Sequence, residues 1–231
     1  MKKYIYHEKN DETSFIFYIP NFITSNESKK YLSRLNEINS NEWKGGYAFG
    51  REIPRLQRWY SNNNQYFYPK WHMRFDRWQP QTYEKWLNIL QEKVSTKLEN
   101  IFTNYYKEYQ SFKPFQVNST QINYYRNQDD MIPQHRDHLK TFGENPSIAI
   151  LSLGSDRNMK FERIDPYSEN IKTLKEENNK NTNVKLEHGS IIIMAGTTQK
   201  YFSHGIPREY EEYGKRYSLT FRNHQIFKDI I

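Results

Sequence analysis

The sequence contains no cysteine, and this absence removes several kinds of site at once. Disulfide bonds, cysteine zinc sites and thiol nucleophiles are excluded, so histidine, aspartate and glutamate remain as possible metal ligands. A chain without disulfides fits an intracellular location, either nuclear or cytoplasmic. Any metal chemistry of this protein is therefore expected to depend on histidines and carboxylates.

Long apolar segments are also missing. The apolar run at residues 191–195 is far shorter than the roughly 20 residues that a membrane-spanning helix needs. The first residues, MKKYIYHEKNDETS, lack the uninterrupted apolar core of a secretory signal peptide. We therefore expect a soluble protein that makes no contact with a membrane.

Hydrophobic residues are scarce, whereas aromatic residues are abundant. The hydrophobic fraction is 35% and the aromatic fraction 16%, with 19 Tyr and 14 Phe, so rings with a polar edge must form much of the core. At 231 residues the chain has the length of one large domain. Its formal net charge of +7 favours a polyanionic partner such as nucleic acid, although a general excess of lysine would give the same total.

The first half of the chain shows one strand pattern, two helical patterns and an irregular region. Residues 15–19 form an aromatic and β-branched run that predicts a strand. A helix is predicted over residues 26–35, with Ser25 as its cap and a buried face of Tyr31, Leu32 and Leu35. Residues 45–79 have no sustained period and are interpreted as surface loops and hairpins. Farther on, the three- to four-residue spacing of apolar side chains predicts an amphipathic helix containing Trp86, Leu90, Val94, Leu98 and Ile101.

The second half of the chain has the pattern of short strands separated by turns. The predicted strands cover residues 116–125, 147–153, 159–163, 185–187, 190–194, 200–204 and 216–225. A segment rich in Lys, Glu and Asn at residues 165–183 is expected to be a solvated loop. Many short strands of this kind are typical of a jelly roll. The predicted fold class is therefore α+β, mainly β, with a jelly-roll core at residues 113–231 and an N-terminal extension with helices at residues 1–112, together forming one continuous unit.

One histidine and one aspartate are separated by a single residue in the segment HRD at positions 135–137. In an extended segment the side chains at i and i+2 point to the same face, so His135 and Asp137 would aim at one point. A second histidine from a distant strand would complete the two-histidine, one-carboxylate triad that binds non-haem Fe(II). His204, in the segment YFSHGIP, is the candidate. An H-x-D triplet by itself is more often a surface or turn feature.

The other histidines are weaker candidates for metal ligands. His138 is three residues from His135, but Pro133 and the lack of helical periodicity argue against a zinc-binding helix, and the sequence has no HExxH motif. The remaining four lie near the termini, in an arginine-rich stretch or in a turn, and they are His7, His72, His188 and His224.

The last predicted strand, RYSLTFR, has two distinct faces. One face has Arg216, Ser218, Thr220 and Arg222, and the other has Tyr217, Leu219 and Phe221. If the arginine face is the barrel interior, each guanidinium needs an anion, because an unpaired buried charge is very costly. One arginine would pair with a small dicarboxylate and the other with Asp137. The alternative is an outer strand with solvated arginines and an aromatic inner face.

Together these motifs resemble the AlkB family of Fe(II)/2-oxoglutarate-dependent dioxygenases. The resemblance extends from about residue 49 to residue 222. It rests on N-x-Y at Asn123 and Tyr125, H-x-D at His135 and Asp137, the distal His204, and the strand R-x-S-x-T-x-R ending at Arg222. It implies a double-stranded β-helix, which is a jelly roll with the metal at its open end.

The resemblance also implies roles for individual residues. The expected iron ligands are His135, Asp137 and His204. Arg216 would hold the distal carboxylate of 2-oxoglutarate, and Arg222 would fix the oxoacid end and Asp137. The other residues in contact with the cosubstrate would be Asn123, Tyr125, Thr220 and Ser218, the last at a position where many family members have Asn. The implied cofactors are Fe(II), 2-oxoglutarate and dioxygen.

The segment AFGREIPRLQRWYSNNNQYFYPKW is similar to the nucleotide-recognition region of family members that act on duplex DNA. Phe49 would be a wedge that fills the space of an extruded base, and Arg55 would lie near the pocket. Tyr66 and Tyr68 would form a hairpin lid that stacks on the base. Alternatively, the aromatic rings of this segment simply pack a subdomain against the barrel. Phosphates would be neutralised by Lys44, Arg51, Arg58, Lys70, Arg74 and Arg77.

The residues that surround the H-x-D motif differ from the family pattern at one point. Family members that repair DNA often have an acidic residue directly after the motif or one position beyond. Here His138 and Leu139 occupy those positions, so His138 is a candidate substrate contact and the choice of base is open. Asp129 and Asp130, which precede the motif, are expected to be solvated turn residues.

By this resemblance we expect an oxidative demethylase that repairs N-alkylated bases in DNA, of the 1-methyladenine and 3-methylcytosine type, with release of formaldehyde, succinate and carbon dioxide. DNA is a more probable partner than RNA, and the expected state is a monomer. Three alternatives stay open: an RNA demethylase, including one for N6-methyladenine; a protein hydroxylase with the same fold; and a nucleic-acid-binding module without catalysis.

Overall fold

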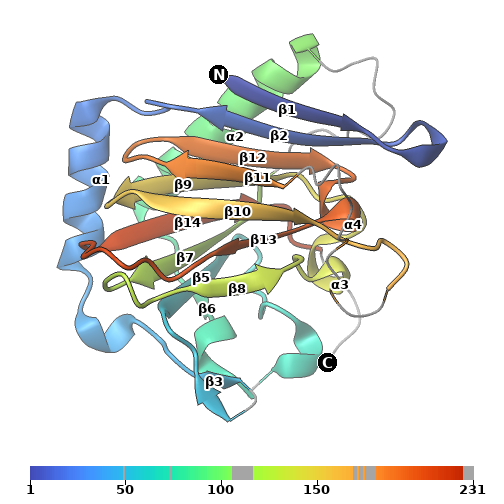
Figure 1. The fold of residues 1–231 in the computed structure, drawn as a ribbon. Helices are drawn as coiled ribbons and strands as arrows, with labels where there is room; N and C mark the ends of the chain where they lie inside the picture. Colours follow the sequence, from blue (N-terminus) through green and yellow to red (C-terminus); the bar gives the residue numbers. More distant parts are fainter. Residues whose placement is uncertain are drawn as a thin grey trace.

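The computed structural model describes residues 1–48, 50–72, 74–105, 117–168, 171, 174 and 181–225 (Figure 1). The helices are α1 (Ser25–Glu37), α2 (Lys85–Tyr105), α3 (Leu139–Phe142) and α4 (Thr198–Tyr201), with the short 3₁₀ helices η1 (Lys9–Asp11), η2 (Ser40–Glu42), η3 (Pro69–Trp71) and η4 (Asp76–Trp78). The strands are β1 (Lys2–His7), β2 (Thr13–Ile19), β3 (Tyr47–Ala48), β4 (Arg51–Glu52), β5 (Leu56–Ser61), β6 (Pro80–Gln81), β7 (Ser119–Tyr125), β8 (Ile132–His135), β9 (Ile148–Gly154), β10 (Arg157–Arg163), β11 (Thr182–Leu186), β12 (Ile191–Gly196), β13 (Phe202–Ile206) and β14 (Arg216–Arg222).

Most strands belong to two sheets that pack against each other (Figure 1). The larger sheet has the strand order β1-β2-β12-β9-β14-β7-β5-β6, and the smaller sheet has the order β11-β10-β13-β8. β3 and β4 form a separate hairpin. The pairs are antiparallel, apart from the short parallel pair of β5 and β6. The predicted fold class, a mainly-β jelly roll, is confirmed.

The larger sheet is buried on both faces. In β12, Ile191 and Ile193 belong to the core on the side of α1 and α2, whereas Ile192 and Met194 belong to the core between the two sheets. A strand with two buried faces has a continuous apolar sequence instead of an alternating one, as this run of isoleucines shows. The larger sheet therefore forms a rigid layer between the helices and the smaller sheet.

The two long helices agree with the prediction, apart from the cap of the first. The N-cap of α1 is Thr24, whose Oγ1 accepts a hydrogen bond from Glu27 N at 3.2 Å, while Glu27 Oε2 accepts one from Thr24 N at 2.9 Å. The prediction of Ser25 as the cap is wrong, because the reciprocal capping box requires a Glu three positions after the cap. Leu32 is only half-buried. α2 buries Leu90, Val94 and Leu98 as predicted.

The interpretation of residues 45–79 as surface loops is wrong for their central part. β5 pairs with β7 inside the larger sheet, and Trp59 and Tyr60 are fully buried on its two faces. Phe67 and Tyr68, from the turns that follow, and Phe142, from α3, form a third core cluster around Trp59. The strand was missed because a strand buried on both faces has no alternating pattern, and because Arg58 suggested an exposed surface.

Other differences concern element limits. β1 was not predicted, although it pairs with β2 along its whole length. The predicted strand at residues 200–204 is divided between α4 and β13. The predicted boundary between residues 112 and 113 lies outside the described residues, as do parts of segments 116–125 and 165–183; strands from both sides of that boundary share the larger sheet. Within the described ranges, no helix is both long and apolar enough to cross a membrane.

Candidate metal centre and cosubstrate pocket

The two candidate histidines lie on neighbouring strands of the smaller sheet. β8 pairs with β13, and in this register His135 is the Cα partner of His204, with the ring centroids 4.3 Å apart. Asp137 follows β8, and its Oδ1 lies 3.8 Å from His135 Nε2. The ligand atoms of the three side chains all lie within 4.8 Å of one another, so the three residues could hold one metal ion.

The surroundings of the two histidines favour neutral imidazole, the form that binds a metal. Burial lowers the pKa of His135, against the opposing effect of Asp137. Burial also lowers the pKa of His204 well below its usual value, and His135 and Arg222 lower it further. His135 Nδ1 lies 3.0 Å from Pro133 O, and in the tautomer that donates this hydrogen bond Nε2 is left to bind a metal.

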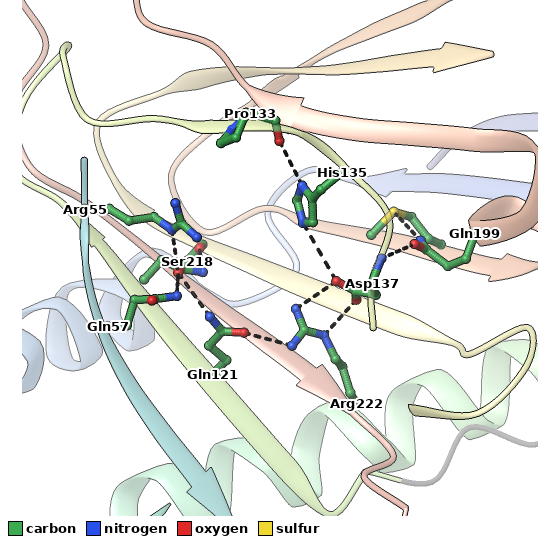
Figure 2. Close-up of polar contacts among 11 residues, drawn as sticks. Arg55, Gln57, Gln121, Pro133, His135, Asp137, Gln199, Ser218 and Arg222 are labelled. Atoms are coloured by element: carbon green, nitrogen blue, oxygen red, sulfur yellow. Dashed lines mark hydrogen bonds and ion pairs between the residues drawn. The ribbon is translucent and has the colours of Figure 1, made fainter. Parts of the chain in front are cut away.

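Asp137 is held from two sides, by Gln199 and by Arg222 (Figure 2). Its backbone N–H donates to Gln199 Oε1 at 2.9 Å. Its carboxylate forms an ion pair with Arg222, in which Nε lies 2.9 Å from Oδ2 and Nη2 donates to Oδ1 at 3.3 Å. The predicted pair of Asp137 and Arg222 is therefore present. Gln199 was not predicted, because it lies 62 residues away and no local pattern marks it.

Arg216 is fully buried, and much of its hydrogen-bonding capacity is unused. Nη2 donates to Ser152 Oγ at 3.0 Å, but Nε and Nη1 have no hydrogen-bond partner in the part of the chain that the structure describes. The centre of the guanidinium lies 5.0 Å from the centroid of the Tyr125 ring. Burial lowers the pKa of Arg216, because removal from water disfavours the charged form. The site therefore fits the carboxylate of a small ligand.

One cavity connects Arg216 to the histidines. Four alternate residues of β14 line it, namely Arg216, Ser218, Thr220 and Arg222, and the other lining residues include Asn123, Tyr125, Ile132, His135, Met159 and His204. The opposite face of β14, with Tyr217, Leu219 and Phe221, lies in the core on the helix side. The alternative of an outer strand with solvated arginines is therefore wrong. A larger groove of about 730 Å³ lies along α2 and β5 and contains none of these residues.

Amide side chains connect this cavity to Arg55 (Figure 2). Asn123 Oδ1 accepts hydrogen bonds from Arg55 Nε at 3.1 Å, Gln57 Nε2 at 3.0 Å and Gln121 Nε2 at 3.3 Å. Gln121 Oε1 accepts one from Arg222 Nη1 at 2.9 Å. The hydrogen bonds thus lead from Arg55 to the arginine that holds the aspartate. Sequence reasoning missed both glutamines, although the position of Gln121 two residues before Asn123 in a strand was a usable signal.

His138 lies in an aromatic environment directly after Asp137. Its ring centroid is 4.7 Å from that of Tyr68 and 5.0 Å from that of Trp71, and its Nδ1 lies 2.6 Å from Thr141 Oγ1. Burial lowers the pKa of His138. Two of the predicted substrate residues, His138 and Tyr68, are therefore in contact, and the third core cluster adjoins the aspartate of the metal centre.

Among the described residues, Tyr66 and Tyr68 do not lie in a β-hairpin, so the predicted hairpin form of the lid is wrong. Between β5 and β6, the described residues form turns and the short helices η3 and η4, and the Tyr66 hydroxyl is bonded to the backbone of Phe75. A hairpin is present at β3 and β4, around Phe49, which itself lies outside the described residues. Nearby rings fill a core cluster, as the packing alternative predicted.

Asp130 and Arg58 form ion pairs within the protein. Asp130 was expected to be solvated, and Arg58 was expected to contact phosphate. Asp130 is buried, and Arg126 Nε and Nη2 both donate to its carboxylate at 2.8 Å, whereas Asp129 is exposed as predicted. Arg58, a predicted phosphate contact, is also buried, and it donates to Glu42 Oε2 at 2.6 Å. Both predictions are therefore corrected, because local ion pairs already use these charges.

Comparison with known proteins gives consistent matches. A family model described as the 2OG-Fe(II) oxygenase superfamily matches residues 15–222. The alpha-ketoglutarate-dependent dioxygenase alkB homolog 3 of Rattus norvegicus is 30% identical over 207 residues, which cover 88% of this chain and 62% of that protein. The DNA oxidative demethylase ALKBH2 of Arabidopsis thaliana is 29% identical over 118 residues, covering 46% and 37% of the two chains. The solved structure of OsALKBH1 has a TM-score of 0.62 at 15% identity, covering 90% and 97%, and shows likeness of fold.

A jelly roll with two histidines and an aspartate beside a buried arginine is the arrangement of a non-haem iron oxygenase that uses 2-oxoglutarate. The chain belongs to the 2OG-Fe(II) oxygenase superfamily and, within it, to the AlkB family. The resemblance found in the sequence is thus confirmed, and the family implies Fe(II), 2-oxoglutarate and dioxygen. The chain spans 62% of the length of the rat relative.

Proposed function

We propose that this protein is an oxidative demethylase that removes N-linked methyl groups of the 1-methyladenine and 3-methylcytosine type from DNA, with release of formaldehyde, succinate and carbon dioxide. The observation that supports this best is the convergence of His135, Asp137 and His204 beside Arg216. The Nε and Nη1 groups of Arg216 have no hydrogen-bond partner among the described residues and could bind an anion. The printed names of the curated relatives, an alkB homolog and a DNA oxidative demethylase, support nucleic acid as the substrate.

Some residues of the site would bind the metal and the cosubstrate, and others position the metal-binding residues. His135, Asp137 and His204 would hold Fe(II), which supplies the oxidative chemistry together with dioxygen and 2-oxoglutarate. Arg216 would bind the distal carboxylate of the cosubstrate, and Arg222 keeps Asp137 oriented. The apolar side chains in the cavity wall, Ile132, Ile150, Met159 and Ile206, would limit the access of water to the reacting groups.

The substrate side of the proposal rests on Arg55, Tyr68 and His138. Tyr68 and His138 contact each other next to Asp137, and Arg55 is bonded to Asn123 in the cavity wall. An enzyme that acts on a base must take it out of the stack, and aromatic side chains are suited to receive it. Phe49 and Tyr66 stay predictions for wedge and stacking roles. Phosphate contacts would come from the exposed Arg51, Lys70 and Arg74.

Mass spectrometry of methylated oligonucleotides tests the proposal. The protein is incubated with Fe(II), ascorbate, 2-oxoglutarate and single-stranded or duplex DNA, the same sequence as RNA, or a peptide. We expect a mass decrease of one methyl group in DNA, with equimolar succinate, and no decrease with His135→Ala. Preferential loss of the methyl group from RNA would indicate an RNA demethylase, and oxidation of the peptide would indicate a protein hydroxylase. Binding of nucleic acid without any turnover would indicate a binding module. Each of these three results would overturn the proposal.

A further inference from the structure

Around the metal centre lie several buried polar atoms that have no hydrogen-bond partner among the described residues. They include Arg216 Nε and Nη1, Asp137 Oδ2 and Gln57 Oε1. The Arg216 atoms face the proposed place of a carboxylate, and Asp137 Oδ2 belongs to a metal ligand. Gln57 Oε1 has neither explanation. Because a buried acceptor without a donor costs free energy, such an atom calls for a donor, and a ligand bound at the site can supply one.

The orientation of the Gln57 amide is fixed by its neighbour. Gln57 is the Cα partner of Asn123 in the pairing of β5 with β7, and only 1% of its surface is exposed. Its Nε2 donates to Asn123 Oδ1 at 3.0 Å. If the amide were flipped, its oxygen would face the oxygen of Asn123, and two acceptors would repel each other. The free acceptor is therefore the oxygen, and it requires an N–H or O–H donor.

Gln57 adjoins both the cavity of the two histidines and the aromatic cluster. Gln57 and Trp59 are alternate residues of β5 and share one face of it, and Arg55 lies just before the strand. Trp59 belongs to the aromatic cluster that contains Tyr68, the ring in contact with His138. Asn123, the partner of Gln57, lines the cavity of the two histidines. Gln57 thus lies beside a residue of the cavity wall and on the same strand face as a residue of the aromatic cluster.

We propose that Gln57 Oε1 accepts a hydrogen bond from the exocyclic amino group of the methylated base, so that Gln57 selects amino bases over their oxo counterparts. This inference rests on the proposed function. In 1-methyladenine and 3-methylcytosine an exocyclic nitrogen with N–H donors adjoins the methylated ring nitrogen. In 1-methylhypoxanthine and 3-methyluracil a carbonyl oxygen takes that place, and it would leave two buried acceptors facing each other. A site built to bond an N–H rejects an analogue that lacks it.

The test compares two single-stranded DNA oligonucleotides that differ only in one base, 1-methyladenine or 1-methylhypoxanthine. Methyl loss is followed by mass spectrometry, and binding to the Mn(II)-loaded protein by fluorescence anisotropy. We expect kcat/KM to favour 1-methyladenine at least about tenfold in the wild type. Gln57→Leu and Gln57→Met should bring this ratio close to one, mainly by slowing the amino substrate.

Gln121→Leu is the matched control. Gln121 also donates to Asn123 Oδ1, but its own oxygen is already bonded to Arg222, so the variant should keep the wild-type ratio. An unchanged ratio in both Gln57→Leu and Gln57→Met, or an equal fall of the ratio in Gln121→Leu, would overturn the inference. If both bases are demethylated without any dependence on Gln57, this inference alone fails; if neither oligonucleotide is bound or demethylated, the proposed function fails with it.

Discussion

At the scale of single residues, the cosubstrate pocket depends on a buried charge without a protein carboxylate beside it. In Arg216→Met the guanidinium, which donates a hydrogen bond to Ser152 Oγ, is replaced by an apolar side chain. We expect the affinity for 2-oxoglutarate to fall about thirtyfold or more, because losing one partner of a buried charged contact costs about 2–5 kcal/mol. The free energy of unfolding without cosubstrate should be unchanged or higher, because Met does not bury an unpaired charge.

Two measurements check this prediction for Arg216. Succinate formation as a function of 2-oxoglutarate concentration gives the affinity, and urea unfolding of the protein without cosubstrate gives the stability. Ser152→Ala is the control, since it removes the neutral partner and leaves the charge in place. A variant Arg216→Met with wild-type affinity but reduced stability would show that this arginine serves the fold and not the cosubstrate.

We expect Gln199 to act as a positioning residue for Asp137, one of the three candidate metal ligands. Gln199→Leu keeps the size of the side chain but removes the acceptor that lies 2.9 Å from Asp137 N. We expect Mn(II) affinity, measured by calorimetric titration, to fall about 10- to 100-fold, as is usual when an outer partner of a metal ligand is lost. Gln128→Leu, at a half-buried position in the loop before β8, should bind Mn(II) as the wild type does. Equal affinities in both variants would exclude this role.

Site residues could be predicted from the sequence only where they lie close together in the chain or where few residues of the required type exist. His135 and Asp137 are two positions apart, and the second histidine ligand had to be one of the other six of the seven histidines. The glutamines Gln57 and Gln199 could not be predicted, because their partners lie on other elements and an amide side chain has no distinctive role in a single sequence. Asp130 was misjudged because its pairing with the preceding loop becomes visible only in three dimensions.

At the scale of elements, the start of α1 provides a sensitive comparison of two adjacent hydroxyl residues. Thr24→Ala removes the side chain that accepts from Glu27 N, and we expect a loss of about 1 kcal/mol in the free energy of unfolding. Ser25→Ala should change it by less than about 0.5 kcal/mol, because Ser25 lies inside the helix and is exposed. Urea unfolding measures the free energy of unfolding of both variants. A larger loss in Ser25→Ala than in Thr24→Ala would show that Ser25 is the N-cap.

The capping residue Glu27 also links α1 to α2, because its carboxylate forms an ion pair with Lys93. This ion pair makes the stability of the protein depend on pH. Lys93 and the backbone of Thr24 lower the pKa of Glu27 to about 2 from 4.5. Since the pKa is lower in the folded state, this contact stabilises the fold fully above about pH 4.5, and the stabilisation is lost as the pH falls toward 2. Glu27→Gln should therefore show a shallower loss of stability over this interval in pH-dependent unfolding. Glu37→Gln, at an exposed pair, is the control and should keep the wild-type slope.

Elements could be predicted where one face is exposed, and they were missed where periodicity is hidden. α2 alternates a buried stripe with charged positions, and its period is visible in the sequence. β5 places Trp59 in one core and Tyr60 in another, so its two faces are equally aromatic. α4 has only four residues, which is too short for any period to be recognised, and its sequence was therefore assigned to the following strand.

At the scale of the whole molecule, the site exists only because the two sheets face each other. The histidines belong to the smaller sheet, whereas Arg216, Arg222 and Asn123 belong to the larger one. This assembly was predicted from motifs in a family-like order and not from periodicity, since no local pattern specifies which strands become neighbours. The larger sheet also contains β2 and β5 from the first part of the chain, so that part contributes directly to the layer that supports the cosubstrate residues.

Arg157, at the start of β10, is the residue that we expect to hold the loops next to both metal-binding strands. It is almost fully buried, and its guanidinium donates to the carbonyl oxygens of Asn127 at 3.2 Å and Asp130 at 2.9 Å, before β8, and to that of Pro207, after β13. Arg157→Met leaves these carbonyls without their donor, so the free energy of unfolding should fall by at least about 3 kcal/mol and Mn(II) affinity should fall with it. Arg34→Met, at an exposed ion pair, should change stability by less than about 1 kcal/mol and leave Mn(II) affinity unchanged. Unfolding and Mn(II) titration of both variants decide the matter, because a destabilised Arg157→Met that still binds Mn(II) with wild-type affinity at low temperature would mean that the loops keep the histidines in place without this arginine.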